Sequence, residues 1–459
     1  MAVEPDRFAA EFWSARPLLS RAADLPAGLS GPAGSGSPPG SNGPASRSAP
    51  AGPGASARPD DRTEPGKPAG SSDPAGPAGP GNRTGPSAPV GFDDLFSLAA
   101  ADELLSRRGL RTPFLRIAKG GVMLDRSRFT RSGGAGAEID DQVADDRVLD
   151  LFAGGHTLVL QALHRTWSPI MEFTGQLAAD LGHPVQVNAY ITPAQNTGFS
   201  AHYDVHDVFV LQVAGEKRWV VHEPPVPMPL RDQPWTEHRA AVAAAAKGEP
   251  VLAEVLRPGD ALYLPRGYLH AAEALGAVSA HLTFGVHPVT RYNVVQALTT
   301  LAAEQPDLRA SLPLGVDGTD PGQLGPDLAG TVEALIGWLR RADPAAVAEQ
   351  LRGQLAGAVP PGPIAPLAQA AVAGSAGAGT LIRLRPGLRC RLHADGDRVQ
   401  LDLPDRRLSL PASTEPAVKA VLTGGPLAIG DLPGLDPDDQ LTLARRLLRE
   451  AIAVPSTPP

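Results

Sequence analysis

Short apolar segments separated by turn residues fill the middle of the chain. Residues 208–213 are apolar except for Gln212 and predict a buried strand. Gly215 then marks a turn, and residues 218–221 are expected to form the return strand of a hairpin. Ala261–Leu264 lies between two turn-forming triplets, and residues 278–286 alternate loosely between apolar and polar positions. Many short strands with frequent turns predict a mainly β domain, a double-sheet jelly roll.

The pattern becomes helical after this β region. Residues 290–375 are rich in alanine and leucine at helical spacing, with Asp343-Pro344 typical of a helix start. Apolar and arginine positions alternate in the last part before a hairpin turn at Asp395-Gly396. A helix is predicted from Pro437 to Ile452, capped by Asp436 and ending in arginines.

Residues 27–89 differ in composition from the rest. Proline, glycine, serine and alanine dominate this segment. Such a composition cannot bury enough apolar surface to offset the entropy lost on ordering. We therefore expect a disordered insertion between the first helix and the β domain, with a partner-binding linker as the alternative.

Length, charge and cysteine content narrow the possibilities. A chain of 459 residues predicts two or three domains, and the net charge of -8 argues against nucleic-acid binding over the whole surface. The arginines of the last part could form a nucleic-acid patch, but the aspartates beside them favour an ordinary solvated face. The single cysteine, Cys390, excludes an internal disulfide framework. The first residues do not match a signal peptide, and we expect no membrane-spanning segment. The sequence therefore predicts a cytoplasmic location and no membrane partner.

Two histidines and an aspartate carry the candidate chemistry. His202 and Asp204 are two residues apart, so on a strand both side chains would point to one face. His270 follows the apolar segment Ala261–Leu264 and is expected just past its end. Two imidazoles and one carboxylate on one side of a metal form the facial triad of non-haem Fe(II) oxygenases. A His-x-Asp pair alone is weak evidence, and His206 could replace His202 in the set.

Three segments together give the chain a more specific resemblance. They are residues 188–193 (NAYITP), residues 198–219 with the core GFSAHYD, and residues 264–273 (LPRGYLHAAE). With His281-Leu282-Thr283, they resemble the JmjC-type ribosomal oxygenases. The N-terminal residues 8–19 look like the opening helix of the same family, so the resemblance predicts a helix there. That resemblance implies a cupin fold and 2-oxoglutarate- and Fe(II)-dependent hydroxylation of a protein.

The resemblance also implies residue roles. His202, Asp204 and His270 match the iron ligands, and Lys217 matches the lysine that holds the distal carboxylate of 2-oxoglutarate. Without the resemblance, Lys217 would be read as an exposed lysine at a hairpin tip, because it lies between Glu216 and Arg218. An ammonium group suits a buried dicarboxylate, since it supplies charge-assisted hydrogen bonds.

Three further polar residues match positions that line the co-substrate pocket: Asn188, Tyr190 and Thr283. Each could equally be a satisfied core residue, and His281 is expected to be one. The chain departs from the family at Gly285, where relatives often carry a small polar side chain, and the loop between His270 and His281 is one residue shorter. His206 is expected near the substrate entrance.

The resemblance extends to the domain plan. It implies an N-terminal helix packing on the barrel (1–26), the insertion (27–89), a JmjC/cupin catalytic domain (90–289), a helical dimerisation domain (290–375) and a winged-helix-like domain (376–459). The expected function is hydroxylation of an arginine or histidine side chain of a protein. The resemblance implies that this substrate is a ribosomal protein and that the enzyme is a homodimer. Alternatives are a non-catalytic metal- or ligand-binding cupin, a hydroxylase of another peptide substrate and, less favoured, a lysine demethylase.

Overall fold

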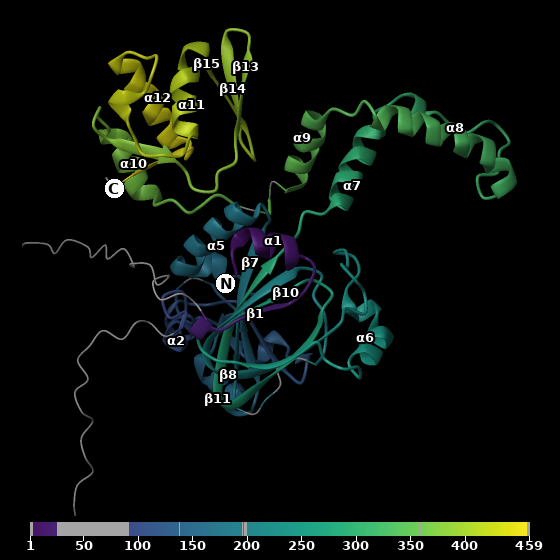
Figure 1. The fold of residues 1–459 in the computed structure, drawn as a ribbon. Coiled ribbons are helices and arrows are strands. Elements are labelled where there is room, and N and C mark those ends of the chain that lie inside the picture. Colours follow the sequence, from purple (N-terminus) through teal and green to yellow (C-terminus); the bar gives the residue numbers. More distant parts are fainter. Residues whose placement is uncertain are drawn as a thin grey trace, which may run out of the picture. The chain divides into compact units, whose positions relative to one another are not determined.

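The computed structural model describes residues 3–24, 91–136, 138–194, 196, 200–355, 357–358 and 360–456. The predicted insertion at 27–89 lies outside the described residues. An antiparallel sheet of nine strands forms the centre of the region before residue 290 (Figure 1). Its strands follow the order β1-β10-β8-β11-β7-β6-β2-β3, with β9 also paired to β8. This is the mainly β, cupin-type core that the strand pattern predicts.

The strands of this sheet and a small two-stranded sheet, β4 with β5, have the following bounds: β1 Leu18–Ser20, β2 Leu115–Lys119, β3 Val122–Met123, β4 Thr130–Arg131, β5 Gln142–Val143, β6 Thr157–Leu160, β7 Val185–Thr192, β8 Asp207–His222, β9 Leu252–Leu256, β10 Ala261–Leu264 and β11 Leu269–Val286. The helices of the same region are α1 Pro5–Glu11, α2 Leu98–Arg107, α3 Asp145–Ala153, α4 Leu163–Thr166, α5 Ser168–Leu181 and α6 Arg239–Ala245. Short 3₁₀ turns lie at Ala22–Asp24, Arg126–Arg128 and Trp235–Glu237.

The predicted hairpin at Gly215 is wrong. Residues 207–222 form one continuous strand, β8, which pairs with β11 along both halves of its length (Figure 1). The register shifts between the pairs Leu275↔Glu216 and Ala280↔Ala214, so the pair bends at a bulge instead of reversing. Gly215 has φ +62°, and a Cβ there would lie 2.2 Å from the carbonyl oxygen of Val278. Glycine is therefore required at position 215 because two backbone segments approach closely. In the sequence alone, such a glycine cannot be distinguished from a turn glycine.

The two faces of the sheet bury different side chains. One face packs Ala189, Leu282 and Phe284 against the helices α2, α3 and α5. The other face buries Val208, Val210, Trp219 and Val221 together with residues of β9 and β10. Burying one such side chain completely contributes about 1.5–3 kcal/mol. The strand alternation thus places helices outside the sheet and leaves the second face to line the interior.

The N-terminal segment packs on the sheet, but its helix is shorter than the predicted 8–19. Helix α1 ends at Glu11, and the chain then forms strand β1, which pairs with β10. Phe8 and Phe12 pack against Tyr263 of β10. Phe8 in α1 and Phe12 just after it therefore anchor the N-terminal segment to β10, although the helix is shorter than predicted.

The helical region contains α7 Arg291–Ala302, α8 Pro321–Leu339 and α9 Pro344–Leu355, with a 3₁₀ turn at Asp307–Arg309. The predicted helix start at Asp343-Pro344 is confirmed, because α9 begins at Pro344 and the Asp343 carboxylate accepts a hydrogen bond from the Ala345 amide. Helix α8 contains no buried residue among those that the structure describes.

The last part of the chain has its own core, built from three helices and two small sheets. Its elements are α10 Pro366–Ser375, β12 Leu381–Leu384, β13 Arg391–Asp395, β14 Arg398–Asp402, β15 Arg407–Pro411, α11 Glu415–Leu422, β16 Leu427–Ala428, α12 Pro437–Arg449 and β17 Ala453–Pro455, with 3₁₀ turns at Ala412–Thr414 and Ile429–Asp431.

The sequence pattern predicted much of this last part correctly. The Asp395-Gly396 hairpin is confirmed, and α12 begins at Pro437 with Asp436 as its N-cap. The helix ends at Arg449, three residues before the predicted end. The alternating residues before this hairpin fall into two strands of different sheets, because β12 pairs with β16 and β17 while β13 joins β14. Within the described residues no helix is long and apolar enough to cross a bilayer.

Candidate metal centre

His202, Asp204 and His270 meet at one point of the structure. One potential ligand atom from each lies within 4.8 Å of the others. His270 is the second residue of β11, inside the strand and not past the end of β10 as expected. His202 and Asp204 lie in the segment before β8, where His202 forms an isolated β-bridge, so they are not on a regular strand. Tyr203 between them is buried and points into a separate apolar cluster.

Backbone hydrogen bonds hold the two histidines opposite each other. The His202 amide donates to the His270 carbonyl (3.1 Å), and the His270 amide donates to the His202 carbonyl (2.9 Å). The Gly267 amide also donates to the Asp204 carbonyl (3.0 Å). The imidazole rings are 4.5 Å apart between centroids. The main chain therefore sets the spacing of the three side chains.

Further hydrogen bonds orient the imidazoles. Nδ1 of His202 lies 2.8 Å from the Ser200 carbonyl oxygen, and Nδ1 of His270 lies 3.0 Å from that of Tyr268. A carbonyl oxygen can only accept, so each Nδ1 carries the proton and donates it. Each Nε2 then keeps a lone pair for a ligand. Nε2 of His270 lies 3.7 Å from a carboxylate oxygen of Asp204.

Electrostatics favour the metal-binding forms of His270 and Asp204 at neutral pH. Burial lowers the pKa of His270 to about 4, and the neighbouring His202 acts in the same direction. Burial alone would raise the pKa of Asp204, but the imidazoles of His206, His270 and His202 outweigh it and lower that pKa. Neutral imidazoles and an ionised carboxylate are the forms that bind a metal.

Lys217 lies inside the fold, not at an exposed tip. Its side chain is buried, and its Nζ lies 3.2 Å from Thr192 Oγ1 and 3.3 Å from His281 Nδ1. Within the described residues no carboxylate forms a salt bridge with it. Burial lowers the pKa of Lys217 to about 7. The interior therefore holds a cationic group without an anionic protein partner.

Trp219 and His281 link this lysine to the triad. The Trp219 ring lies 5.9 Å from that of His270 and 5.4 Å from that of His281. Lys217 and Trp219 are two residues apart on β8 and share a face, and Trp219 pairs with Ala272, two residues after His270. Cross-strand partners also share a face. The buried cation and the candidate ligands thus open onto the same interior.

The other predicted pocket residues lie on this interior as well. Tyr190 stacks on His281, with 5.1 Å between the ring centroids. The Asn188 side-chain oxygen accepts a hydrogen bond from the Ala162 amide (3.1 Å), and Asn188 pairs with Thr283 across β7 and β11. His281 is a buried core residue, as expected. Whether Asn188, Tyr190 and Thr283 contact a co-substrate stays a prediction.

Sequence reasoning overlooked Trp219 and Thr192. Trp219 lies on β8 and Thr192 on β7, and the pairing of these strands with β11 turns both side chains toward the interior. Tryptophan and threonine are not typical of a metal site, so nothing in the sequence pointed to them. A second missed feature is Trp235, from the segment between β8 and β9. Its ring lies 6.3 Å from that of His202 and packs with Tyr203 and Leu269.

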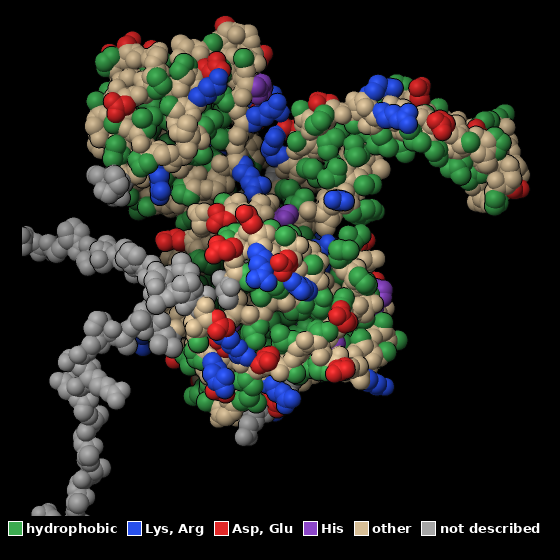
Figure 2. Space-filling model, in the orientation of Figure 1, with side chains coloured by type: hydrophobic (Ala, Val, Ile, Leu, Met, Phe, Trp, Pro, Cys, Tyr) green, Lys and Arg blue, Asp and Glu red, His purple; other side chains and the backbone are tan. Residues whose placement is uncertain are grey.

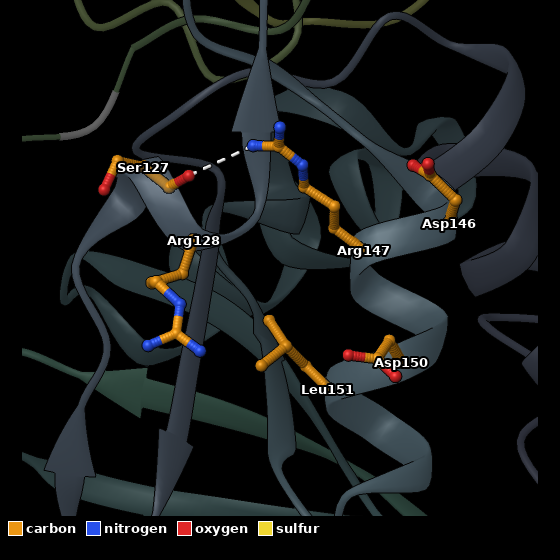
Figure 3. A pocket seen from close by; sticks show the side chains of 6 residues that line it. All are labelled: Ser127, Arg128, Asp146, Arg147, Asp150 and Leu151. Atoms are coloured by element: carbon orange, nitrogen blue, oxygen red, sulfur yellow. Dashed lines mark hydrogen bonds between the residues drawn. The ribbon is translucent and has the colours of Figure 1, made fainter.

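A hollow of about 400 Å³ lies away from this centre (Figure 3). Ser127, Arg128, Asp146, Arg147, Asp150 and Leu151 line it. Arg147 donates to the carbonyl oxygens of Ser127 and Thr130, so its charge is engaged by the main chain. Arginine and aspartate lie around the hollow together, and none of the triad residues borders it.

The donor set fits a particular group of metals. Two imidazole nitrogens and one carboxylate oxygen on one side of an ion form the arrangement used by non-haem Fe(II) oxygenases. The Lys217 ammonium, which has no carboxylate partner among the described residues, fits a carboxylate ligand in the same interior. These residues thus suit Fe(II) together with an organic acid.

Comparison with known proteins gives the same class. Residues 167–294 match the family model of the JmjC domain, a span that includes His202, Asp204, Lys217 and His270. The chain therefore carries a JmjC domain. Beyond that domain match, the chain is similar to proteins named ribosomal oxygenases.

Individual relatives cover only part of the chain. The human protein "Ribosomal oxygenase 1" is 30% identical over 220 residues, 46% of this chain and 32% of that protein. A Drosophila persimilis protein, "Bifunctional lysine-specific demethylase and histidyl-hydroxylase NO66", is 34% identical over 139 residues, 29% of this chain and 19% of that protein. The chain thus spans about a third or less of the length of these relatives.

Among solved structures, the Escherichia coli ribosomal oxygenase YcfD is similar at 14% identity and a TM-score of 0.48. The match covers 99% of this chain and 98% of that one. A second structure of YcfD, in complex with cobalt and 2-oxoglutarate, matches with a TM-score of 0.46.

Proposed function

We propose that the chain is a 2-oxoglutarate- and Fe(II)-dependent oxygenase that hydroxylates an arginine or histidine side chain of a ribosomal protein. The observation that carries this proposal is the pairing of a facial His-Asp-His set with a buried lysine in one interior. A metal site alone does not require a buried cation. A co-substrate with two carboxylates does.

Each side chain has a defined task in this proposal. His202, Asp204 and His270 hold Fe(II), and Lys217 binds the distal carboxylate of 2-oxoglutarate. When bound, the iron and the co-substrate supply the oxygen activation that hydroxylation of a carbon requires. Val208, Val210 and Trp219 exclude water from the interior, which strengthens the Lys217–carboxylate attraction. Asn188, Tyr190 and Thr283 are proposed to line the co-substrate pocket.

The relatives support the substrate class. Several of them are named ribosomal oxygenases, and others are named bifunctional lysine-specific demethylases and histidyl-hydroxylases. A ribosomal protein as substrate also suits the proposed cytoplasmic location. The names of the latter relatives include lysine demethylation, which remains the less favoured alternative activity, as does hydroxylation of another peptide.

The remaining parts are proposed to follow the family plan. Residues 290–375 would form a helical dimerisation domain, because α8 leaves Leu328, Val332 and Leu339 exposed. Figure 2 shows hydrophobic side chains among charged ones on the surface of this helical region. Residues 376–459 would form a winged-helix-like domain, to which helices α11 and α12 and the hairpin β13–β14 correspond. Direct nucleic-acid binding is not part of the proposal.

The competing function is a non-catalytic cupin that retains the metal ligands. Anaerobic addition of Fe(II) and 2-oxoglutarate distinguishes the two. The oxygenase is expected to show a weak visible charge-transfer band that disappears in His202→Ala. A folded, iron-loaded protein that shows no band would support the non-catalytic reading.

The substrate is tested separately. Ribosomal proteins from a strain lacking this gene are treated with the enzyme, Fe(II), 2-oxoglutarate and oxygen, and mass spectrometry then searches for an added oxygen atom. We expect the increment on one arginine or histidine residue. A band without any such increment would show an oxygenase with a different substrate.

A further inference from the structure

His206 occupies the space that a side chain at position 285 would fill. A Cβ built on Gly285 would lie 2.6 Å from Cδ2 and 2.7 Å from Nε2 of His206. Gly285 does not have a positive φ, so its backbone would accept a side chain. The absence of a side chain at 285 therefore serves to admit the His206 ring, because real Cβ atoms do not approach so closely.

This ring belongs to the interior that the metal centre faces. Gly285 alternates along β11 with Leu282, Phe284 and Val286, which pack on the helix-covered face. It therefore shares the opposite face with His281 and Thr283. His206 follows Asp204 by two residues and is the strongest of the charges that lower the pKa of the Asp204 carboxyl. Its ring nevertheless lies outside the group of three converging ligand atoms.

Two further side chains lie near His206 and Gly285. Its ring stacks on that of His287, with 5.0 Å between centroids and 24° between planes. Gln186, which pairs with Gly285 across β7 and β11, brings its Cγ to 3.2 Å from the same built Cβ. Two imidazoles and one amide thus form a wall beside the candidate metal ligands. All three side chains are only partly buried, so the wall is open to an incoming group.

The charges around this wall favour one kind of substrate side chain. The charged groups that act on the pKa of His287 are His206, Arg231, Asp204 and His164, and those that act on Tyr190 are Asp204 and Arg116. Asp204 is the one carboxylate in this set, and a bound metal would engage it. Asp207, on whose pKa His206 also acts, already accepts hydrogen bonds from the Arg266 amide and the Ser14 hydroxyl. A guanidinium in this place would lack an anionic partner and would be desolvated at a cost. A neutral imidazole can accept or donate hydrogen bonds to the wall.

We propose that His206, seated against Gly285, determines substrate specificity and selects a histidine over an arginine side chain for hydroxylation. This inference rests on the proposed function and sharpens it. His206 acts by touching the presented side chain, and Gly285 acts by leaving His206 in place.

Two variants test whether Gly285 acts through His206. Gly285→Ala introduces a Cβ that displaces the His206 ring, while His206→Ala removes the ring. Each is expected to lower histidine hydroxylation roughly tenfold, the value of a lost hydrogen bond, with the anaerobic Fe(II)/2-oxoglutarate band unchanged. The double variant is expected to lose no more than His206→Ala alone, because both changes remove the same contact. Gly175→Ala, at an exposed helical glycine with open space around its built Cβ, is the matched control.

A third variant tests the choice of side chain. Gln186→Glu keeps the size of the residue and adds a carboxylate to the wall. The probe is the ribosomal protein fraction of a strain lacking this gene, and mass spectrometry assigns each added oxygen to histidine or arginine. Wild-type protein is expected to modify histidine, and Gln186→Glu to raise the arginine-to-histidine ratio by roughly tenfold, the value of a charge-assisted hydrogen bond.

The outcomes separate the two levels of the proposal. If wild-type protein with Fe(II) and 2-oxoglutarate shows no anaerobic band, the oxygenase function itself is overturned. Three outcomes with an intact band would overturn the role of His206 alone. They are oxygen added to arginine, no oxygen added to either residue type, and an unchanged hydroxylation rate in His206→Ala. An additive double variant would show that Gly285 acts by another route and would overturn the proposed coupling.

Discussion

Asp207 and Arg266 form a buried contact that joins the two segments carrying the candidate metal ligands. The Arg266 amide donates to Asp207 Oδ1 (2.8 Å), and Ser14 of the N-terminal segment donates to Oδ2 (3.2 Å). The Arg266 guanidinium lies 3.8 Å from the same carboxylate. Asp207 follows Asp204 by three positions and Arg266 precedes His270 by four. The contact therefore fixes both segments at once.

Replacing Asp207 should expose the strength of this contact. Asp207→Ala leaves a buried guanidinium without its carboxylate, so we expect the free energy of unfolding to fall by about 3–5 kcal/mol. Asp207→Asn keeps an acceptor for the Arg266 amide and should cost less. Urea unfolding measures both. Equal losses in the two variants would show that the charge, and not the hydrogen bond, carries the stabilisation.

The bulge in the β8–β11 pair offers a second test. Gly215→Ala adds a Cβ against the Val278 carbonyl at a positive φ, whereas Gly276→Ala has φ +67° with open space around the new Cβ. The control therefore measures the backbone strain alone, about 1–2 kcal/mol. Gly215→Ala is expected to cost several kcal/mol more, since backbone must move. Thermal unfolding of both variants checks this, and similar melting temperatures would contradict it.

Lys217 should destabilise the protein in the absence of co-substrate. Its pKa of about 7 lies below the ordinary 10.5 because of burial. The unfolded chain then binds more protons between pH 7 and 10.5, so stability rises with pH across that window. Lys217→Met removes the buried charge and is expected to raise the melting temperature of the ligand-free protein by about 3 °C or more at pH 6–7. The gain should shrink toward pH 10, and a constant gain would refute the ionisation argument.

The same ionisation predicts how 2-oxoglutarate binding depends on pH. Above pH 7 the ligand-free Lys217 loses its proton, and binding a carboxylate must restore it. The dissociation constant for 2-oxoglutarate should therefore rise by up to about tenfold per pH unit above pH 7. Anaerobic titration of Co(II)-loaded protein measures this constant. Lys217→Met should bind weakly at every pH with no such slope.

The exposed face of α8 predicts a change of oligomeric state. Leu328, Val332 and Leu339 lie four and seven residues apart, so they fall on one side of the helix and are 40–53% exposed. If this face forms the proposed dimer, Val332→Asp should yield a monomer in analytical ultracentrifugation. Glu333→Gln, one position away on another face, should leave the state unchanged. A wild-type monomer would overturn the dimer proposal.

The sequence predicted the order and type of many elements, because alternation and capping are local. The start of α12 at Pro437 and the hairpin at Asp395-Gly396 depend on neighbouring residues alone. Gly215 was misread because a close approach to Val278, sixty-three positions later, looks like a turn when only the local sequence is visible. The distinction between a turn and a bulge lies in the partner strand.

In the candidate site too, local sequence features could be predicted and features that depend on paired strands could not. Residue type and spacing indicated the two histidines and the aspartate, but the residues themselves placed Lys217 in solvent between two charged neighbours. Only the resemblance to a family suggested an interior role. The contacts of Trp219, Thr192 and Asp207 were not predicted, since each depends on strands brought together by the fold. His206 could be named but not placed, because its position depends on the missing side chain at 285.

The bridge between His202 and His270 has a practical consequence for genetics. The paired amides and carbonyls belong to the main chain, so either imidazole can be removed while the polypeptide keeps its hydrogen bonds at that point. A strain carrying a single alanine at 202 or 270 should therefore accumulate normal amounts of folded protein. Any phenotype it shows would report lost chemistry, free of the ambiguity that attends a deleted gene.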